Sequence, residues 1–160
     1  DKVFINTAAI KNPKFIEQAA NIYGSQCIVA SIEAKKIGSK QWEAYVDNGR
    51  ESTGINVIDW VKETENLGAG EIFLTSVDRD GTKLGLEEEL IKEVSKTSNL
   101  PLVVSGGFGS LDQIKNLSLT FAQTVCTPRS FLSVLQQPSL VHPVNGSLEQ
   151  DSKGSPNIFF

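Results

Sequence analysis

Short apolar runs alternate with helical patterns along the first 119 residues, and this alternation restricts the possible folds more than any other feature. Four runs rich in Val and Ile are expected to be strands: 2–6, 27–33, 71–78 and 101–107. Each run precedes a helical pattern, and one strand-helix unit takes roughly 25 to 30 residues once a hairpin is set aside. Because the runs are nearly continuous in apolar residues, they are typical of parallel strands covered on both faces. The sequence therefore predicts an α/β fold made of βα units.

Helix starts and ends are marked by capping residues. Asn12 as cap, Pro13 at the first helical position and Gly24 as the stop predict a helix. Further helical patterns cover 55–68 and 86–99, and another begins near Ser110 as a candidate cap. The residues expected to face the core are Phe15, Ile16, Ala19, Ala20 and Tyr23 in the first helix and Ile55, Ile58, Val61 and Leu67 in the second.

The segment 35–54 separates the second strand from its helix. Trp42, Ala44 and Val46 alternate with polar residues, and the run ends in Asp47-Asn48-Gly49. Alternation followed by an Asn-Gly turn indicates a β-hairpin. We therefore expect a hairpin inserted above the sheet.

The length decides how much of a barrel the chain can hold. A complete (βα)8 barrel needs ~250 residues, whereas this chain has 160 and begins without Met. We expect a piece of a longer protein, with about four βα units forming half of a TIM-type barrel over 1–120. From Phe121 the regularity is expected to fail, because Pro, Ser, Gly and Asn accumulate, so 121–160 is predicted to be a divergent, poorly ordered tail.

Composition excludes several classes of function. The net charge is -4 and the basic residues are dispersed among carboxylates, which argues against binding nucleic acid. No apolar run approaches ~20 residues and the start lacks a secretory pattern, so we expect no membrane segment and a cytoplasmic location. Cys27, Cys126 and the single His142 are too few and too scattered for a disulfide framework or a metal site.

Polar or small residues follow each predicted strand. They are Asn6 and Thr7 after the first, Glu33 at the end of the second, 78–82 after the third and 105–107 after the fourth. The C-terminal ends of parallel strands open into the loops that bind ligands. We therefore expect these residues to meet on one face.

Two of these groups have alternative interpretations. Ser105-Gly106-Gly107 before a helix favours a phosphate site, although a tight turn that needs positive φ would use the same glycines. Glu33 suits acid or base chemistry, or it forms a salt bridge with Lys35 or Lys36.

Other charged residues near the strands also have more than one interpretation. Of Asp78 and Asp80, one is expected to brace Arg79 and the other to face substrate. Lys2 and Glu71 lie at the N-terminal ends of strands and, by position alone, are solvated charges at the opposite mouth.

Five segments carry a family resemblance. They are DKVFINTAAIKNP, YGSQCIVASIEAKK, the W-x-x-x-V-x-N-G-R stretch of 42–50 with Thr53-Gly54, GAGEIFLTSVDRDGTKLG and LPLVVSGGFGSL. In this order they resemble the second half of the cyclase subunit of imidazole glycerol phosphate synthase, over about 1–117.

The resemblance implies a (βα)8 barrel in which ammonia from a glutaminase subunit reacts with a phosphorylated ribonucleotide. Imidazole glycerol phosphate, for histidine synthesis, and an aminoimidazole carboxamide ribonucleotide would be released, and no metal or redox cofactor is implied. The implied roles are catalysis for Glu33 and Asp80, substrate or phosphate binding for Asn6, Thr7, Thr75, Gly81, Ser105, Gly106 and Gly107, and ammonia entry for Lys2 and Glu71.

Departures from the family pattern leave alternatives open. Glu33 stands where the family usually has Asp, and the other family carboxylate belongs to the first strand of the complete barrel, in the half that this sequence does not contain. The segment 124–128 is a poor match to the strand that should follow Leu119. A paralogue that amidates a surface sugar is one alternative. Another is a non-catalytic, phosphate-binding half-barrel that pairs with a copy of itself or with the missing N-terminal half, because its sheet edges would be uncovered.

Overall fold

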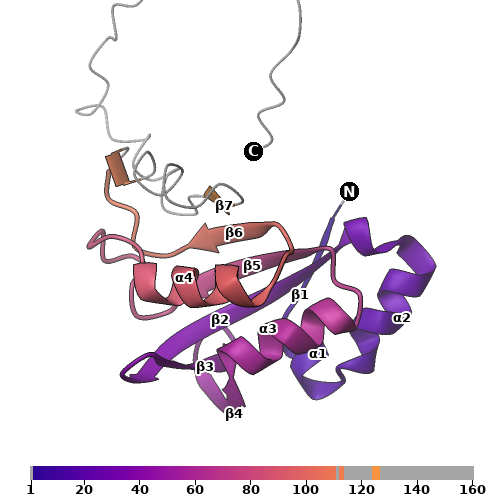
Figure 1. Ribbon diagram of the computed structural model, residues 1–160. Coiled ribbons are helices and arrows are strands. Elements are labelled where there is room, and N and C mark those ends of the chain that lie inside the picture. The colour runs from indigo at the N-terminus through magenta and orange to yellow at the C-terminus, as the bar shows by residue number, and fades with distance from the viewer. Residues whose placement is uncertain (1, 111, 114–123, 127–160) are drawn as a thin grey trace, which may run out of the picture.

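The computed structural model describes residues 2–110, 112–113 and 124–126. Strands and helices alternate along the chain, and the strands form one sheet (Figure 1). The strands are β1 (Val3–Ile5), β2 (Ile28–Gly38), β3 (Gln41–Val46), β4 (Glu51–Asn56), β5 (Glu71–Ser76), β6 (Leu102–Ser105) and β7 (Thr124–Cys126). The helices are α1 (Thr7–Lys11), α2 (Lys14–Tyr23), the 3-10 helix η1 (Ser25–Cys27), α3 (Val57–Asn66) and α4 (Glu88–Thr97).

Five of the strands are parallel and follow each other in chain order. Neighbouring pairs are β1 with β2, β2 with β5, β5 with β6 and β6 with β7. The hairpin strands β3 and β4 are antiparallel and attach to the far end of β2. This arrangement confirms the predicted βα repeat, and within the described residues the sheet is open.

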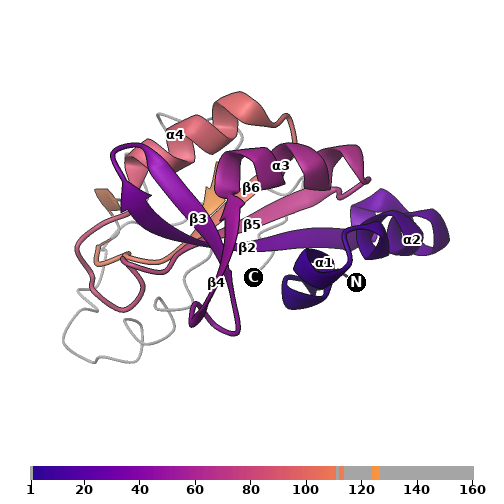
Figure 2. The ribbon, with the colours of Figure 1, turned by 90° about the horizontal axis from the view of Figure 1, so that it is seen from below.

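The hydrophobic core lies on one face of this sheet. Alternate residues of β2 belong to it: Ile28, Ala30, Ile32 and Ala34 are each at most 1% exposed. Residues of α1, α2, α3 and α4 complete the same cluster. Figure 2 shows α3 and α4 on one side of β2 and β5, with α1 and α2 at the end of β2 away from the hairpin. The other sheet face is therefore left to odd-numbered residues of β2 and β5.

The hairpin has the predicted alternation and turn. Trp42, Ala44 and Val46 are buried, and Asp47, Asn48 and Gly49 all have positive φ, at 52°, 56° and 74°. The second strand is longer than expected, because β2 continues to Gly38 by pairing with β3.

The prediction of the first helix is wrong about its start and about two of its core residues. An additional helix, α1, ends at Lys11 with Asn12 as its C-cap, so α2 has Pro13 rather than Asn12 as its N-cap. Gly24 ends α2 as expected, with φ 85°. Ile16 is fully buried, but Phe15 and Tyr23 are 42% and 65% exposed. Phe15 is turned by about 100° from Ile16 around the helix, and Tyr23 is its last residue.

Helix α3 packs against the core with a different set of residues from those predicted. Its N-cap Asn56 accepts hydrogen bonds from the N–H groups of Ile58 and Asp59, as expected of an asparagine in this position. Its buried residues are Val57, Trp60, Val61 and Thr64. Of the residues predicted to face the core, Val61 is buried. Ile55, Ile58 and Leu67 are only partly buried, although they pack against the core cluster.

The structure describes only three residues of the predicted tail. The predicted tail 121–160 lies outside the described residues except at 124–126, which form β7 and pair in parallel with β6. The outer edge of β6 offers N–H and C=O groups to these residues, and the poorly ordered tail stays a prediction for the rest of 121–160. Of the helix expected after Ser110, only 112–113 are described, and they are helical.

A helix that crosses a bilayer needs about 20 mostly apolar residues. Among the residues that the structure describes, no helix is long and apolar enough to cross a membrane.

Candidate functional site

Three of the predicted site residues form a row across the sheet. Glu33 on β2 is the register partner of Thr75 on β5, and Thr75 is the partner of Ser105 on β6. Partners in parallel strands point to the same side, here the face away from the core cluster. The structure therefore brings these residues together at the C-terminal ends of neighbouring strands, as the sequence predicted.

Asn6 and Thr7 follow β1 at the same end of the sheet. Asn6 is the N-cap residue of α1, and its backbone oxygen accepts from the N–H groups of Ala9 and Ile10. Its side-chain Nδ2 lies 3.4 Å from the carbonyl oxygen of Tyr45, the residue that pairs with Glu33 on the hairpin side. Asn6 is thus linked to the strand that flanks Glu33.

Glu33 is half-buried and has a defined partner. Its Oε2 accepts a hydrogen bond of 2.8 Å from the backbone N–H of Gly49 in the hairpin turn. The alternative that Glu33 pairs with a neighbouring lysine is wrong. Lys36 pairs with Glu87 and Glu89, and the Lys35 ammonium lies 5.2 Å from the centre of the Tyr45 ring.

The loop after β5 carries Asp78 and Asp80. Asp78 accepts a hydrogen bond of 2.7 Å from the backbone N–H of Lys36, so it ties the loop to β2. Neither aspartate braces Arg79, contrary to the prediction, because the Arg79 Nε lies 3.2 Å from Glu87. Asp80 is exposed beside Gly81, whose φ is 74°. The exposed carboxylate is accessible to a ligand at the rim.

A buried carboxylate joins the loop to β2. The Glu87 side chain is only 9% exposed, and its two oxygens lie 3.1 Å from Lys36 Nζ and 3.2 Å from Arg79 Nε. Lys36 also reaches Glu89 at 3.0 Å. The bonds to Glu89 and then to Glu87 raise the pKa of the Lys36 ammonium, and the bond from Lys36 lowers the pKa of Glu89. This four-residue ion cluster, formed by Lys36, Arg79, Glu87 and Glu89, supports the Asp78–Asp80 loop.

The glycines after β6 are required by close packing. Gly106 and Gly107 have φ of 93° and 99°. A Cβ on Gly106 would lie 2.5 Å from the Ser76 carbonyl oxygen, and one on Gly107 would lie 2.2 Å from the Gly85 carbonyl oxygen. The turn geometry therefore accounts for both glycines, and phosphate binding by them stays a prediction.

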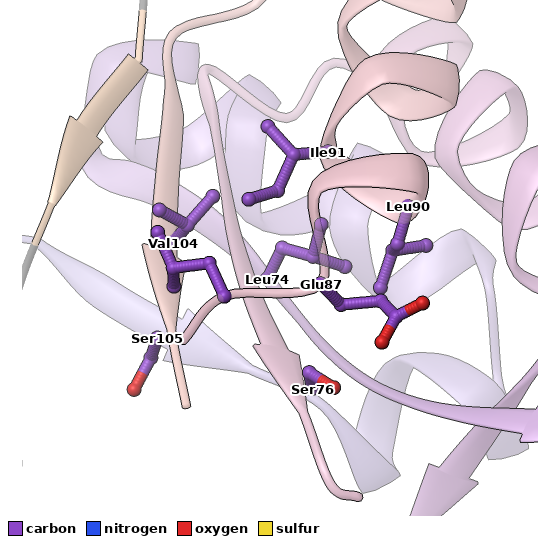
Figure 3. Close-up of a pocket in the computed structure, with 8 residues that line it drawn as sticks. Leu74, Ser76, Glu87, Leu90, Ile91, Val104 and Ser105 are labelled. Carbon is purple, nitrogen blue, oxygen red and sulfur yellow. The ribbon is translucent and has the colours of Figure 1, made fainter. Parts of the chain in front are cut away.

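A small pocket lies on the core side of the sheet, opposite the row of Glu33, Thr75 and Ser105. It is enclosed by α4 and strands β5 and β6 (Figure 3). Its walls are mostly apolar, with Ser76, Glu87 and Ser105 at the edge, and the Ser105 hydroxyl points away from Ile91 in Figure 3. Its cavity volume of about 10 Å³ is roughly what a single buried water needs. We assign it to core packing beneath the loop.

The other end of the sheet carries a separate ion pair. Lys2 next to β1 pairs with Glu71, the first residue of β5. The side chain of Glu71 is 14% exposed, so this charge is not merely solvated. The structure thus places Lys2 and Glu71 together at the predicted opposite mouth.

Sequence reasoning missed Lys36 and Glu87, and it missed the role of Gly49. Glu87 was one of three consecutive glutamates at a helix start, and the helix dipole gave no reason to single it out. Gly49 was recognised as a turn residue, but its contact with Glu33 depends on the β2–β3 register, which places Tyr45 opposite Glu33.

Comparison with known proteins identifies close relatives. A family model described as histidine biosynthesis protein matches residues 1–133. The imidazole glycerol phosphate synthase subunit HisF of Legionella pneumophila is 52% identical over 113 residues, which are 71% of this chain and 53% of that relative. The protein of the same name from Bacillus cereus (strain Q1) is 52% identical over 114 residues, 71% of this chain and 45% of the relative. The chain spans about half the length of the curated relatives that it matches.

Proposed function

Because this chain belongs to the histidine biosynthesis protein family, we propose that the complete protein containing it is an ammonia-dependent cyclase. Its products would be imidazole glycerol phosphate and an aminoimidazole carboxamide ribonucleotide. The relatives that match this chain are named as subunits of imidazole glycerol phosphate synthase. The complete protein would be this chain joined to the other half of the barrel.

The row of Glu33, Thr75 and Ser105 is the single observation that carries this proposal. It sets a carboxylate, a hydroxyl on the next strand and a third polar group in register at the C-terminal end of a parallel sheet. Active sites of βα barrels lie at this end, where loops supply the reacting groups.

In this proposal the carboxylates move protons and the loop residues hold substrate. Glu33 and a carboxylate from the missing half of the barrel act as general acid and base while ammonia adds and the ring closes, a role that suits positioned carboxylates. Asp80 faces the substrate at the rim as a further catalytic group. Asn6 and Thr7 bind one phosphate. Thr75 faces the substrate, and Gly81 with Ser105, Gly106 and Gly107 lines the path to the second phosphate.

Ammonia would enter from the opposite end of the barrel. The Lys2–Glu71 pair lies at the N-terminal ends of β1 and β5, and we propose that a glutaminase subunit docks at this end. The reacting groups at the C-terminal ends would then receive ammonia through the barrel. A shared path of this kind keeps ammonia away from bulk water.

We also propose that residues 1–120 form one half-barrel and that the other half covers the edge of β1 that has no partner strand among the described residues. Val3 and Phe4 on β1 are 56% and 55% exposed, and an edge strand with exposed apolar residues favours pairing with another strand.

We further propose that the complete protein is located in the cytoplasm, and cell fractionation tests this location.

Complementation tests the proposed function. The complete gene is introduced into a bacterial strain that lacks its own cyclase subunit, and growth is measured without histidine. We expect growth with the wild-type gene and with Glu51→Ala, an exposed carboxylate at the start of β4, but none with Glu33→Ala at equal protein level. Growth with the Glu33 variant, or failure of the wild type, would contradict the proposal.

A further inference from the structure

The 47–50 hairpin turn folds back over the middle of β2, beside Glu33. Asp47, Asn48 and Gly49 are consecutive residues with positive φ, and the turn closes through a hydrogen bond of 3.1 Å from the Arg50 N–H to the Val46 carbonyl oxygen. This geometry directs the Gly49 N–H to Oε2 of Glu33 at 2.8 Å. The turn therefore has a defined conformation and a defined target.

The same turn rests against the strand next to Glu33. A Cβ added to Gly49 would lie 2.8 Å from Cγ1 of Val77. Val77 directly follows β5, its N–H donates to the Ala34 carbonyl oxygen, and it precedes Asp78. Gly49 thus lies between the Glu33 side chain and the start of the loop that carries the second carboxylate.

We propose that the 47–50 turn is a positioning element, in which the Gly49 N–H fixes the carboxylate of Glu33 for the reaction. This inference rests on the proposed function of Glu33. A glutamate has one more rotatable bond than an aspartate, so it loses more conformational freedom when it is placed for reaction. The hydrogen bond to Gly49 holds one oxygen and restricts that freedom.

The length of Glu33 matches the distance to the turn. Replacing it with aspartate withdraws the carboxylate by about 1 Å, which would lengthen the 2.8 Å bond beyond the ~3.2 Å limit of a hydrogen bond. We therefore expect Glu33→Asp to lower kcat of the complete protein about 10-fold or more, because misplacement of this size is costly in catalysis. Wild-type kcat in this variant would contradict the proposal.

Two glycines of the hairpin give a matched pair of variants. Gly49 and Gly54 both have φ of 74°, but a Cβ on Gly54 meets nothing within 4 Å. Gly49→Ala and Gly54→Ala therefore both place a side chain at the same positive φ, and only the side chain at position 49 also meets Val77 and displaces the turn. With ammonium salt and substrate, we expect kcat of Gly49→Ala to fall about 10-fold or more with KM changed less than about 3-fold. Gly54→Ala should stay near wild type.

A second substitution separates displacement from misfolding. Val77→Ala removes the atoms that the new Cβ would meet, so adding it to Gly49→Ala should recover a substantial part of kcat. Val77→Ala alone serves as the control. If Gly49→Ala and Gly54→Ala have equal kcat, the turn has no positioning role and the proposal is overturned.

An NMR measurement reports the contact without any reaction. In the complete protein, Glu33→Ala should shift the Gly49 amide resonance by more than Glu51→Ala does, because Glu51 lies two residues from Gly49 whereas Glu33 accepts its N–H hydrogen bond. An unchanged Gly49 resonance in Glu33→Ala would overturn the proposal at any level of activity. If the wild-type protein has no turnover, the proposed function itself fails, and the positioning role fails with it even where the resonance shifts.

Discussion

Glu87 is the residue whose replacement tests the support of the active-site loop most sharply. It is buried, and each of its oxygens faces one cation, Lys36 or Arg79. Glu87→Gln keeps the shape and removes the charge. Sheltered charge-assisted hydrogen bonds contribute about 1.5 to 3 kcal/mol each, but exposed ion pairs contribute about 0 to 1 kcal/mol. Because Lys36 and Arg79 are 39% and 36% exposed, we expect a total loss of about 1 to 2 kcal/mol.

The assay is urea unfolding of the complete protein, with Glu89→Gln as the matched control. Glu89 contacts the same Lys36 from the first turn of α4 but is 56% exposed, so its replacement should leave the free energy of unfolding nearly unchanged. Hydrogen exchange should also become faster in the loop 77–85 of Glu87→Gln only. Equal losses in the two variants, or no loss in Glu87→Gln, would refute the assignment of Glu87 as the buried link of the cluster.

Two further predictions concern the core and the hairpin. Leu74 is 2% exposed in the core and Leu84 is 73% exposed, so Leu74→Ala should lower the free energy of unfolding by about 2 to 5 kcal/mol and Leu84→Ala by less than about 0.5 kcal/mol; comparable losses in urea unfolding would contradict the core assignment. The Ser52 hydroxyl and then the Gly54 N–H lower the pKa of Glu43 from 4.5, so its ionised form stabilises the fold above that pH, and the stabilisation is lost as the pH falls through the lower, folded-state pKa. The difference in Tm between wild type and Glu43→Gln should therefore shrink from about pH 6 to about pH 3, and a constant difference would contradict it.

The sheet could be predicted from the sequence because its signals are local. The parallel strands are nearly continuous in apolar residues, and Trp42, Ala44 and Val46 alternate in a period that fits only a half-buried strand. The extension of β2 through Lys35 and Lys36 could not be read in this way. These charged residues are in a strand because β3 pairs with them, and tertiary pairing overrides local preference.

The candidate site also has a part that could be predicted from local sequence patterns and a part that could not. Its strand-end residues were predicted because parallel strands must place their C-terminal ends together, and the register of Glu33, Thr75 and Ser105 confirms that arrangement. The contacts of Gly49 with Glu33 and of Glu87 with Lys36 join residues 16 and 51 positions apart. No local pattern specifies such contacts, since they depend on the register of the hairpin and on the packing of α4.

The most direct test of the site is the ammonia-dependent rate of the complete protein with Glu33→Ala. A positioned acid or base contributes roughly 10²- to 10⁴-fold to a rate. We predict a fall in kcat of at least about 100-fold, with KM changed only a few-fold and Glu51→Ala at the wild-type rate. A Glu33→Ala protein that turns over as fast as the wild type would contradict the placement of the reaction at this strand end.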